Sequence, residues 1–321
     1  MEPLEIADAS TGSSAKIAAH LGFNCYEFRA DVGGRRIEVL DSADDFAEGK
    51  HRPSGHGIPI LFPYPNRIRG GRFVWEGREH VLSPERVPFD PTGNAIHGLC
   101  LDRPWRVVAQ GPHFAVGRFH LSEDAPDRRA CWPSDFLIEV RYEVGPAALR
   151  ADVRILNPGD TPLPWGFGTH PYFGLPLADE SDPKHCLIEA PASEEWELVN
   201  CLPTGKRQRV GKAKDLRDGE YFPALKLDDV LTGLSVNGDA VECLIMDEKA
   251  GLQVRQRTDA AFRELVVYTP ADRNAVCLEP YTCATDAINL QAQGIDAGWR
   301  LLEPGAEFAT WIEIRAGLVV A

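Results

Sequence analysis

Two segments of the chain place an ionisable side chain among rigid and aromatic residues, where it could transfer a proton. Residues 164–173 read PWGFGTHPYF and surround His170 with aromatic rings. Aromatic faces suit the C–H faces of a sugar, and an imidazole can donate a proton near neutral pH. Residues 276–282 read VCLEPYT, where partial burial of Glu279 would raise its pKa toward the range of a general base. Each pattern alone also fits a structural role, either a histidine in an aromatic core corner or a strand-end glutamate paired with an arginine.

Two shorter motifs hold further polar side chains in loops of restricted geometry. In residues 63–71 (PYPNRIRGG), prolines fix the entry and a glycine pair closes the loop, so Asn66 and Arg67 are held in place. In residues 94–99 (NAIHGL), the glycine after His97 permits close approach of the backbone to a ligand. The alternative interpretations are a hairpin with solvated arginines and a structural imidazole.

Short strands separated by turns are the elements that must position these side chains. Alternating or β-branched apolar residues predict strands at residues 35–40, 72–75, 136–144, 149–156, 265–268 and 308–315. A short helix is predicted within residues 9–21 and another over 286–293, with Asp286 as its N-cap and a glycine as its C-cap. The fold class predicted is all-β, a large antiparallel β-sandwich with few short helices, in one domain over residues 1–321.

The composition is that of a globular protein with an excess of acidic residues. The 321 residues include 48 acidic and 34 basic side chains, a formal net charge of −14, which argues against nucleic acid and anionic membrane surfaces as partners. No apolar run approaches the roughly 18 residues that cross a bilayer. Because the acidic N-terminus lacks the features of a secretory signal, we expect a cytoplasmic protein. The eight cysteines contain no C-x-x-C pair and are expected to be reduced and mostly buried.

Motifs for nucleotide cofactors, serine hydrolases and zinc peptidases are absent from the sequence. It contains no P-loop, no G-x-G-x-x-G after a strand, no G-x-S-x-G and no H-E-x-x-H. His51 and His56, in HRPSGH, are the alternative candidates for a metal site. Two histidines in a Gly/Pro loop are more often surface residues, however, and no further ligands are found beside them. We therefore expect no metal site.

Taken together and in this order, the motifs resemble the aldose 1-epimerase (mutarotase) family. The resemblance extends from about residue 25 to residue 315. It implies a galactose mutarotase-like β-supersandwich with an open cleft for a pyranose, and a reaction without metal or organic cofactor. The matching residues are the NRIRGG loop, His97 with Gly98, the G-x-H-P-Y-F segment around His170, Glu279 with Pro280, and LDDV at residues 227–230, where the family carries a sugar-binding aspartate.

The resemblance also implies a role for each site residue. His170 is identified as the general acid that protonates the ring oxygen, and Glu279 as the general base that takes the proton from the anomeric hydroxyl. One acid and one base suffice to open and close a hemiacetal, which interconverts its α and β anomers. For work near neutral pH, we expect the Glu279 carboxylate to keep His170 protonated. The implied sugar-binding residues are Asn66, Arg67, His97 and Asp228. A small sugar is the expected partner, and the protein is expected to be a monomer or a homodimer.

Departures from the family pattern leave the substrate open. The histidine stands in T-H-P-Y-F where the best-known galactose and glucose mutarotases carry N-H-T-Y-F, and the base segment reads E-P-Y-T where those enzymes commonly carry a glutamine. One alternative function is a hexose-6-phosphate 1-epimerase, in which Arg67, Arg69 and Arg72 would clamp the phosphate. The other is a non-catalytic sugar-binding protein on the same fold.

Overall fold

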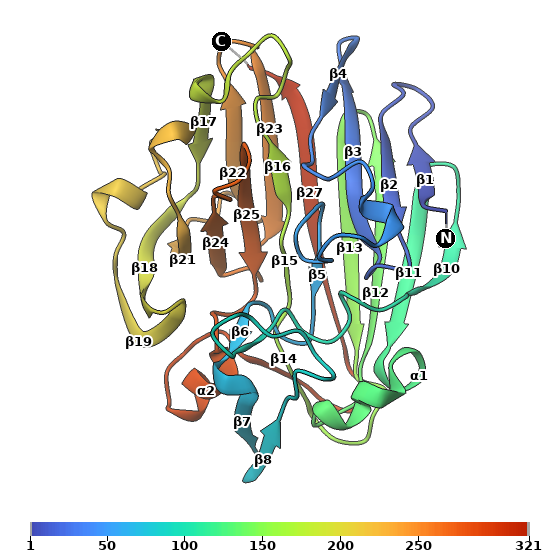
Figure 1. Ribbon diagram of the computed structural model, residues 1–321, viewed down its shortest axis with the longest axis vertical. Coiled ribbons are helices and arrows are strands. Elements are labelled where there is room, and N and C mark those ends of the chain that lie inside the picture. The colour runs from blue at the N-terminus through green and yellow to red at the C-terminus, as the bar shows by residue number, and fades with distance from the viewer. Residues whose placement is uncertain (1, 320–321) are drawn as a thin grey trace.

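Antiparallel strands are the main secondary structure of the computed structural model, which describes residues 2–319 (Figure 1). The largest sheet has nine strands. In spatial order they are β10 (Arg106–Gln110), β11 (Phe114–His120), β12 (Leu137–Gly145), β13 (Ala148–Leu156), β27 (Glu307–Leu318), β23 (Leu252–Asp259), β22 (Ala240–Asp247), β17 (Cys186–Glu189) and β20 (Glu220–Tyr221).

A second sheet has eight strands and carries the segments that the sequence singled out. Its order is β19 (Leu202–Arg209), β18 (Ala192–Val199), β21 (Asp228–Leu234), β24 (Glu264–Tyr268), β25 (Ala275–Tyr281), β15 (Gly168–Thr169) and β5 (Ile60–Leu61), and β16 (Tyr172–Gly174) also pairs with β25. The third sheet has four strands, β1 (Leu4–Ala7), β2 (Ser14–Ala18), β3 (Asn24–Val32) and β4 (Arg35–Glu38). Two-stranded ladders join β14 (Leu163–Trp165) to β26 (Arg300–Leu302), β6 (Arg67–Ile68) to β9 (Ala95–Ile96), and β7 (Arg72–Trp75) to β8 (Arg78–Val81).

Helices are short and lie between strands. The α-helices are α1 (Leu121–Asp124) and α2 (Ala287–Ala292), and the 3-10 helices are η1 (Phe46–Glu48), η2 (Arg69–Gly71), η3 (Pro126–Cys131), η4 (Pro183–His185), η5 (Lys212–Lys214) and η6 (Phe222–Ala224). Across residues 2–319, none of these helices has the length and apolar character needed to cross a membrane.

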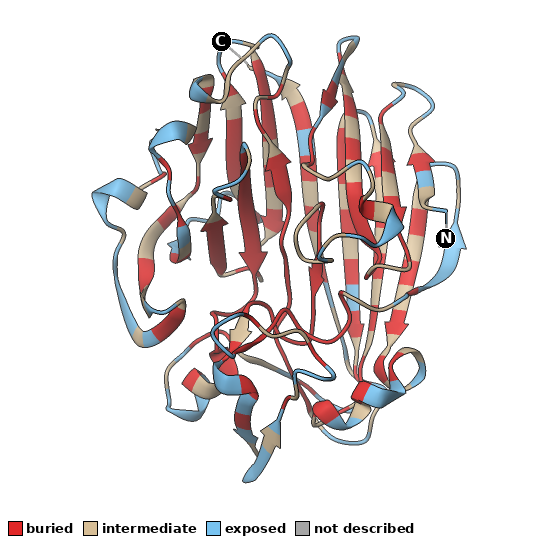
Figure 2. Cartoon of the chain, viewed as in Figure 1, coloured by how far each residue is buried: buried red, intermediate tan, exposed pale blue. Residues whose placement is uncertain are grey.

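The core follows from the alternation of apolar side chains along the strands. In the β12–β13 hairpin, for example, Ile138 pairs with Ile155 and both side chains are fully buried. Residues from all three large sheets belong to one hydrophobic cluster, including Phe28 of β3, Ile138 of β12 and Leu278 of β25. Every residue of β25 is buried (Figure 2). This strand is therefore covered on both faces, and any polar side chain on it lies in a desolvated environment.

The predicted fold class is confirmed: each of the six predicted strands is present, within an all-β antiparallel sandwich. The predicted helix within residues 9–21 is wrong. Residues 14–18 form β2, which pairs with both β1 and β3, and Gly12 makes the turn before it with a φ of 81°. The local pattern of small and apolar residues fits either element, and strand pairing on both sides decides between them.

The helix predicted over residues 286–293 is confirmed as α2, and Asp286 stands at its N-cap position without capping it. The predicted C-cap is wrong, because Gln293 and not the following glycine is the C-cap residue. Asp286 has a φ of 58° and makes no side-chain cap hydrogen bond. Its carboxylate instead accepts hydrogen bonds from the backbone N–H of Arg69 at 3.0 Å and from the side-chain amide of Asn289 at 2.6 Å. Asp286 therefore anchors the loop after β6 to the start of α2.

Candidate active site

Strand register brings polar side chains onto one face of the eight-stranded sheet. On β25, Cys277, Glu279 and Tyr281 share a face because side chains alternate along a strand. The neighbouring β24 places Tyr268 opposite Cys277, and β21 places Asp228 opposite Tyr268. These pairings set the two carboxylates, Asp228 and Glu279, on the same face of the sheet.

Two short strands on the other side of β25 position His170. β15 pairs with β25 through Gly168, and β16 pairs with it through Tyr172, so His170 is held between them beside Glu279. Glycine is required at position 168 because a Cβ atom there would lie 2.3 Å from the ring of Tyr281. Nε2 of His170 lies 3.3 Å from Oε1 of Glu279, and the side chains are only 8% and 2% exposed. A proton donor and a proton acceptor thus meet at a buried site.

The His170–Glu279 pair lines a cavity of about 220 Å³. The six residues singled out from the sequence all line it: Asn66, Arg67, His97, His170, Asp228 and Glu279. Further lining residues include Arg52, Ser54, Asp90, Tyr172 and Tyr268. Four separate motifs and one aspartate therefore converge on a single hollow.

The loop residues Asn66 and His97 reach the cavity through an unusual backbone conformation. Both are non-glycine residues with positive φ, 53° and 65°, and the N–H of His97 donates to the carbonyl of Asn66 at 2.8 Å. Gly98 also has positive φ, and a Cβ atom there would lie 2.2 Å from the carbonyl oxygen of Phe62. Backbone strain of this kind is concentrated at functional sites, where surrounding structure enforces it.

Asp90, which the sequence did not single out, fixes the guanidinium of Arg67. Its Oδ2 accepts from Nε of Arg67 at 2.6 Å, while its Oδ1 accepts from the backbone N–H groups of Thr92 and Asn94, each at 2.9 Å. Burial alone would raise the pKa of Asp90, but the N–H of Asn94 and the Arg67 guanidinium outweigh it and hold this pKa well below its usual range. The sequence D-P-T-G-N is typical of an Asx turn and was the available signal.

Two tyrosines, also missed, contact the acid–base pair. The hydroxyl of Tyr281 donates a hydrogen bond to Oε2 of Glu279, the oxygen that does not face His170. The ring of Tyr172 stacks on the His170 ring with centroids 4.6 Å apart and planes 10° from parallel. Each tyrosine stands two residues after the group it contacts, so the alternation of a strand could have revealed both.

Burial sets the protonation of the pair. It lowers the pKa of His170 to about 3, with further lowering by nearby arginines, among them Arg273. It raises the pKa of Glu279 well above the usual value, although the Tyr281 hydrogen bond opposes the shift. Both directions favour a neutral imidazole beside a protonated carboxyl. The expectation that Glu279 keeps His170 protonated is therefore wrong in direction, because desolvation of both groups outweighs their mutual attraction.

The arginines that could clamp a phosphate do not converge. Arg67 lines the cavity, whereas Arg69 pairs with Asp286 and Arg72 pairs with the exposed Glu79. The 3-10 helix η2, in which Gly70 and Gly71 both have positive φ, separates these side chains. The three-arginine clamp considered for a sugar phosphate is not formed.

His51 and His56 make contacts with protein groups. Nε2 of His51 lies 2.5 Å from Oδ1 of Asp45, and Nδ1 of His56 accepts from the backbone N–H of Ala43 at 3.3 Å. The structure does bring together another set of possible metal ligands, which the sequence did not predict. Within residues 2–319, one His/Cys/Asp/Glu group has its ligand atoms all within 4.8 Å of one another, and its members are His170, Cys277 and Glu279.

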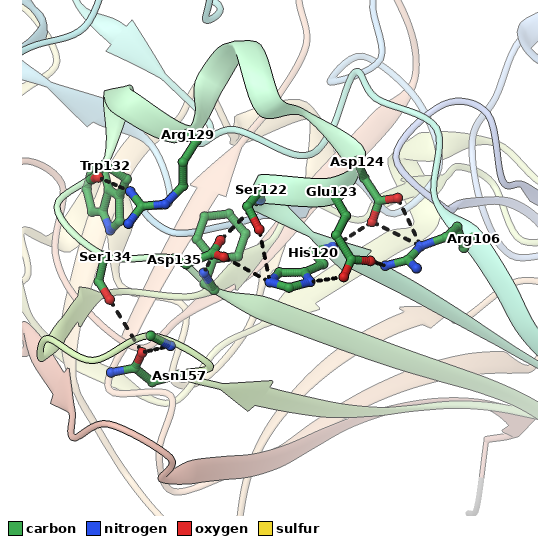
Figure 3. Close-up of polar contacts among 12 residues, drawn as sticks. Arg106, His120, Ser122, Glu123, Asp124, Arg129, Trp132, Ser134, Asp135 and Asn157 are labelled. Carbon is green, nitrogen blue, oxygen red and sulfur yellow. Dashed lines mark hydrogen bonds and ion pairs between the residues drawn. The ribbon is translucent and has the colours of Figure 1, made fainter.

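A second histidine–carboxylate cluster lies at the start of α1 and has a structural role (Figure 3). Nε2 of His120 lies 2.9 Å from Asp135, and its Nδ1 lies 3.0 Å from Glu123. The backbone N–H of Ser122 also donates to Asp135 at 3.1 Å. Because both ring nitrogens are engaged and His120 does not line the cavity, this cluster holds the end of β11 against the following turn.

The sequence of the chain is similar to those of known proteins. A family model described as aldose 1-epimerase matches residues 8–315. The Escherichia coli (strain K12) protein YihR, described as uncharacterized, is 24% identical over 255 residues, which cover 79% of this chain and 77% of YihR.

Solved structures agree in fold. A galactose mutarotase-like protein from Clostridium acetobutylicum superposes with a TM-score of 0.85 at 20% identity, over 99% of each chain. A GalM/aldose epimerase homologue from C. elegans superposes with a TM-score of 0.78 at 20% identity, again over 99% of each chain. At such identities the likeness establishes the fold alone.

Proposed function

The chain belongs to the aldose 1-epimerase family, and on this premise we propose that it interconverts the α and β anomers of a free aldose by opening and closing the sugar ring. The observation that carries the proposal is the 3.3 Å contact between His170 and Glu279 within the cavity. The anomeric oxygen and the ring oxygen of a pyranose are bonded to the same carbon. An acid and a base that serve them must therefore both reach the same small part of the cavity, and two adjacent residues that line it can do so.

The reaction follows from proton transfer at those two oxygens. The carboxylate of Glu279 takes the proton from the anomeric hydroxyl, while Nε2 of His170 protonates the ring oxygen, and the C1–O5 bond breaks. Rotation about C1–C2 of the open aldehyde and reversal of the two transfers give the other anomer. Each residue ends the cycle in the state in which it began, so no co-reactant is needed.

The proton count of the pair explains how buried groups can serve this reaction. An ionised Glu279 beside a protonated His170 carries the same number of protons as the neutral pair favoured by burial. One proton shift across the contact converts the neutral pair into the reactive one, with no exchange with solvent. Because burial lowers one pKa and raises the other, the one-proton pair persists over a wide pH range that includes neutrality.

The four remaining residues that the sequence singled out are proposed to hold the sugar hydroxyls. Arg67 is oriented by Asp90 and Asn66, and His97 is fixed by its loop backbone. Asp228 projects from β21 toward the same cavity. A guanidinium, an imidazole and a carboxylate together supply hydrogen-bond donors and acceptors, which suits the several hydroxyl groups of a sugar.

Anomer exchange measured over a panel of free aldoses tests the proposal directly. Polarimetry or NMR exchange spectroscopy should show acceleration of mutarotation for at least one aldose, with a smaller effect on glucose 6-phosphate than on glucose. Preference for the phosphorylated sugar would replace the proposal with the hexose-6-phosphate alternative. Calorimetric binding of a sugar without acceleration would identify a sugar-binding protein instead.

We expect full activity after dialysis against a chelator. Proton transfer by His170 and Glu279 accounts for both halves of the reaction, so removal of divalent metal should not lower kcat. Mutarotation rates before and after dialysis, with metal content checked by mass spectrometry, provide the measurement. Loss of activity that only an added divalent ion restores would contradict the mechanism.

Tyr281→Phe is expected to lower kcat/KM by about 10- to 100-fold, the worth of a hydrogen bond to a charged group. The Tyr281 hydroxyl lowers the pKa of Glu279, so its removal raises that pKa and reduces the ionised fraction of the carboxyl. The His170–Glu279 pair then loses its proton at higher pH. In a plot of kcat/KM against pH, the fall in activity on the basic side should therefore move to higher pH.

The measurement is kcat/KM against pH in the presence of a chelator. Tyr142→Phe, at a buried tyrosine of β12 outside the cavity, is the matched control and should leave the profile unchanged. A basic limb that stays in place in Tyr281→Phe would show that the hydroxyl does not tune Glu279.

A further inference from the structure

Cys277 adds a thiol to the acid–base pair, and no step of the proposed reaction uses it. It precedes Glu279 by two residues on β25 and therefore faces the same side of the sheet. Ligand atoms of Cys277, Glu279 and His170 all lie within 4.8 Å of one another, and all three residues are buried. A sulfur, a nitrogen and a carboxylate oxygen are the donor types found in zinc sites.

The spacing suits a tetrahedral ion. Zinc bonds of about 2.0–2.1 Å to nitrogen and oxygen place these two ligands about 3.3 Å apart in a tetrahedron. Nε2 of His170 and Oε1 of Glu279 already lie 3.3 Å apart. In the same tetrahedron, sulfur lies about 3.6 Å from a nitrogen or oxygen ligand. Because the three ligand atoms already lie within 4.8 Å of one another, the Cys277 sulfur has to move toward the other two by little more than about 1 Å.

The charge balance also permits a metal in this buried position. Entry of Zn²⁺ displaces one proton from the thiol of Cys277 and one from the carboxyl of Glu279, while His170 binds as the neutral imidazole. The net charge of the cluster is therefore the same before and after binding. Arg52 and Arg67, which line the cavity, oppose a cation. A thiolate ligand compensates by favouring soft ions such as Zn²⁺ over Mg²⁺ or Ca²⁺.

We propose that His170, Cys277 and Glu279 form an inhibitory site for a soft divalent cation, with Zn²⁺ as the probe, and with water from the cavity as the fourth ligand. Bound zinc would occupy Nε2 of His170 and an oxygen of Glu279, the atoms that must exchange protons with the sugar. Inhibition rests on the proposed function, whereas binding does not.

Zinc titration of the metal-stripped, full-length protein tests the site. Calorimetry should show one zinc per chain, and Co²⁺ should give the thiolate-to-metal absorption band of a sulfur-bound ion. Mutarotation should fall to a small residual rate as the site fills. Cys277→Ser should retain the activity that the unmodified protein has in chelator. It should require at least about 100-fold more zinc for half-inhibition, because even residues that only hydrogen-bond to metal ligands change metal affinity by about 10- to 100-fold.

Cys243→Ser is the matched control, because Cys243 is a buried cysteine of β22 that does not belong to the His170–Cys277–Glu279 cluster. Its zinc response should equal that of the unmodified protein. Cys277→Ala provides a second variant if the serine change perturbs folding, which circular dichroism would report. Absence of zinc binding to the unmodified protein would overturn the proposal. So would half-inhibition of the two Cys277 variants at the same zinc concentration as the unmodified protein. If the protein shows no mutarotation, the proposed function fails, and calorimetry and the Co²⁺ spectrum still decide the metal site.

Discussion

Glu279→Gln is expected to lower kcat by about 10²- to 10⁴-fold, the usual range for removing a positioned proton-transfer group. Glutamine keeps the shape of the side chain and can still accept the Tyr281 hydrogen bond, but it cannot take a proton from the anomeric hydroxyl. His170→Ala should cost a similar factor because the ring oxygen then lacks its proton donor. Single-sugar mutarotation rates at saturating substrate are the measurement.

Glu264→Gln is the matched control for this change. Glu264 lies on the neighbouring strand β24, is fully buried, and accepts a hydrogen bond from Nε1 of Trp196 at 3.0 Å. It does not line the cavity, so its replacement should leave kcat near that of the unmodified protein. Near-normal turnover in Glu279→Gln would remove Glu279 from the mechanism, and equal losses in both variants would indicate a general effect of altering a buried carboxyl.

Six strands and six of the residues that line the cavity were predictable because both leave local patterns. Strand alternation is visible within the nine residues of β12 and the nine residues of β13. The motifs around His170 and Glu279 combine rigid, aromatic and ionisable residues within a few positions. Local pattern failed at β2, where pairing with distant segments overrides it.

The residues that support the site were harder to find because their partners are far away in sequence. Asp90 contacts Arg67 across 23 positions, and nothing near either residue specifies that contact. Cys277 stood inside a recognised motif, but its proximity to His170 depends on how β15 and β16 pair with β25. The protonation of His170 depends on the extent of its burial, which follows from the packed fold rather than from its neighbours in the chain.

Asp90→Ala is expected to reduce the free energy of unfolding by about 3 kcal/mol, the lower end for breaking a buried ion pair. The lower end applies because the Arg67 side chain keeps 16% of its exposure and can be partly hydrated. The change also removes the acceptor of the turn formed by Thr92 and Asn94. KM should rise more than kcat falls, because a displaced Arg67 would bind the substrate and the transition state more weakly by similar amounts.

Urea unfolding and steady-state kinetics of Asp90→Ala and Asp127→Ala provide the comparison. Asp127 also pairs with an arginine at 2.6 Å, but that pair is on the surface, with side chains 29% and 50% exposed. Surface pairs contribute about 0–1 kcal/mol, so Asp127→Ala should change neither stability nor KM appreciably. Equal loss of stability in the two variants would contradict the assignment of Asp90 as a buried anchor.

The double variant Arg67→Ala/Asp90→Ala distinguishes an effect of Asp90 through Arg67 from a general weakening of the loop. If Asp90 acts on the sugar by holding Arg67, Arg67→Ala alone should raise KM, and adding Asp90→Ala should raise it little further. Residues in direct contact are expected to show such non-additivity, whereas independent residues add. A KM effect of Asp90→Ala that persists in full after Arg67 has been removed would show that Asp90 acts by another route, of which its own position on the cavity wall is the first to examine.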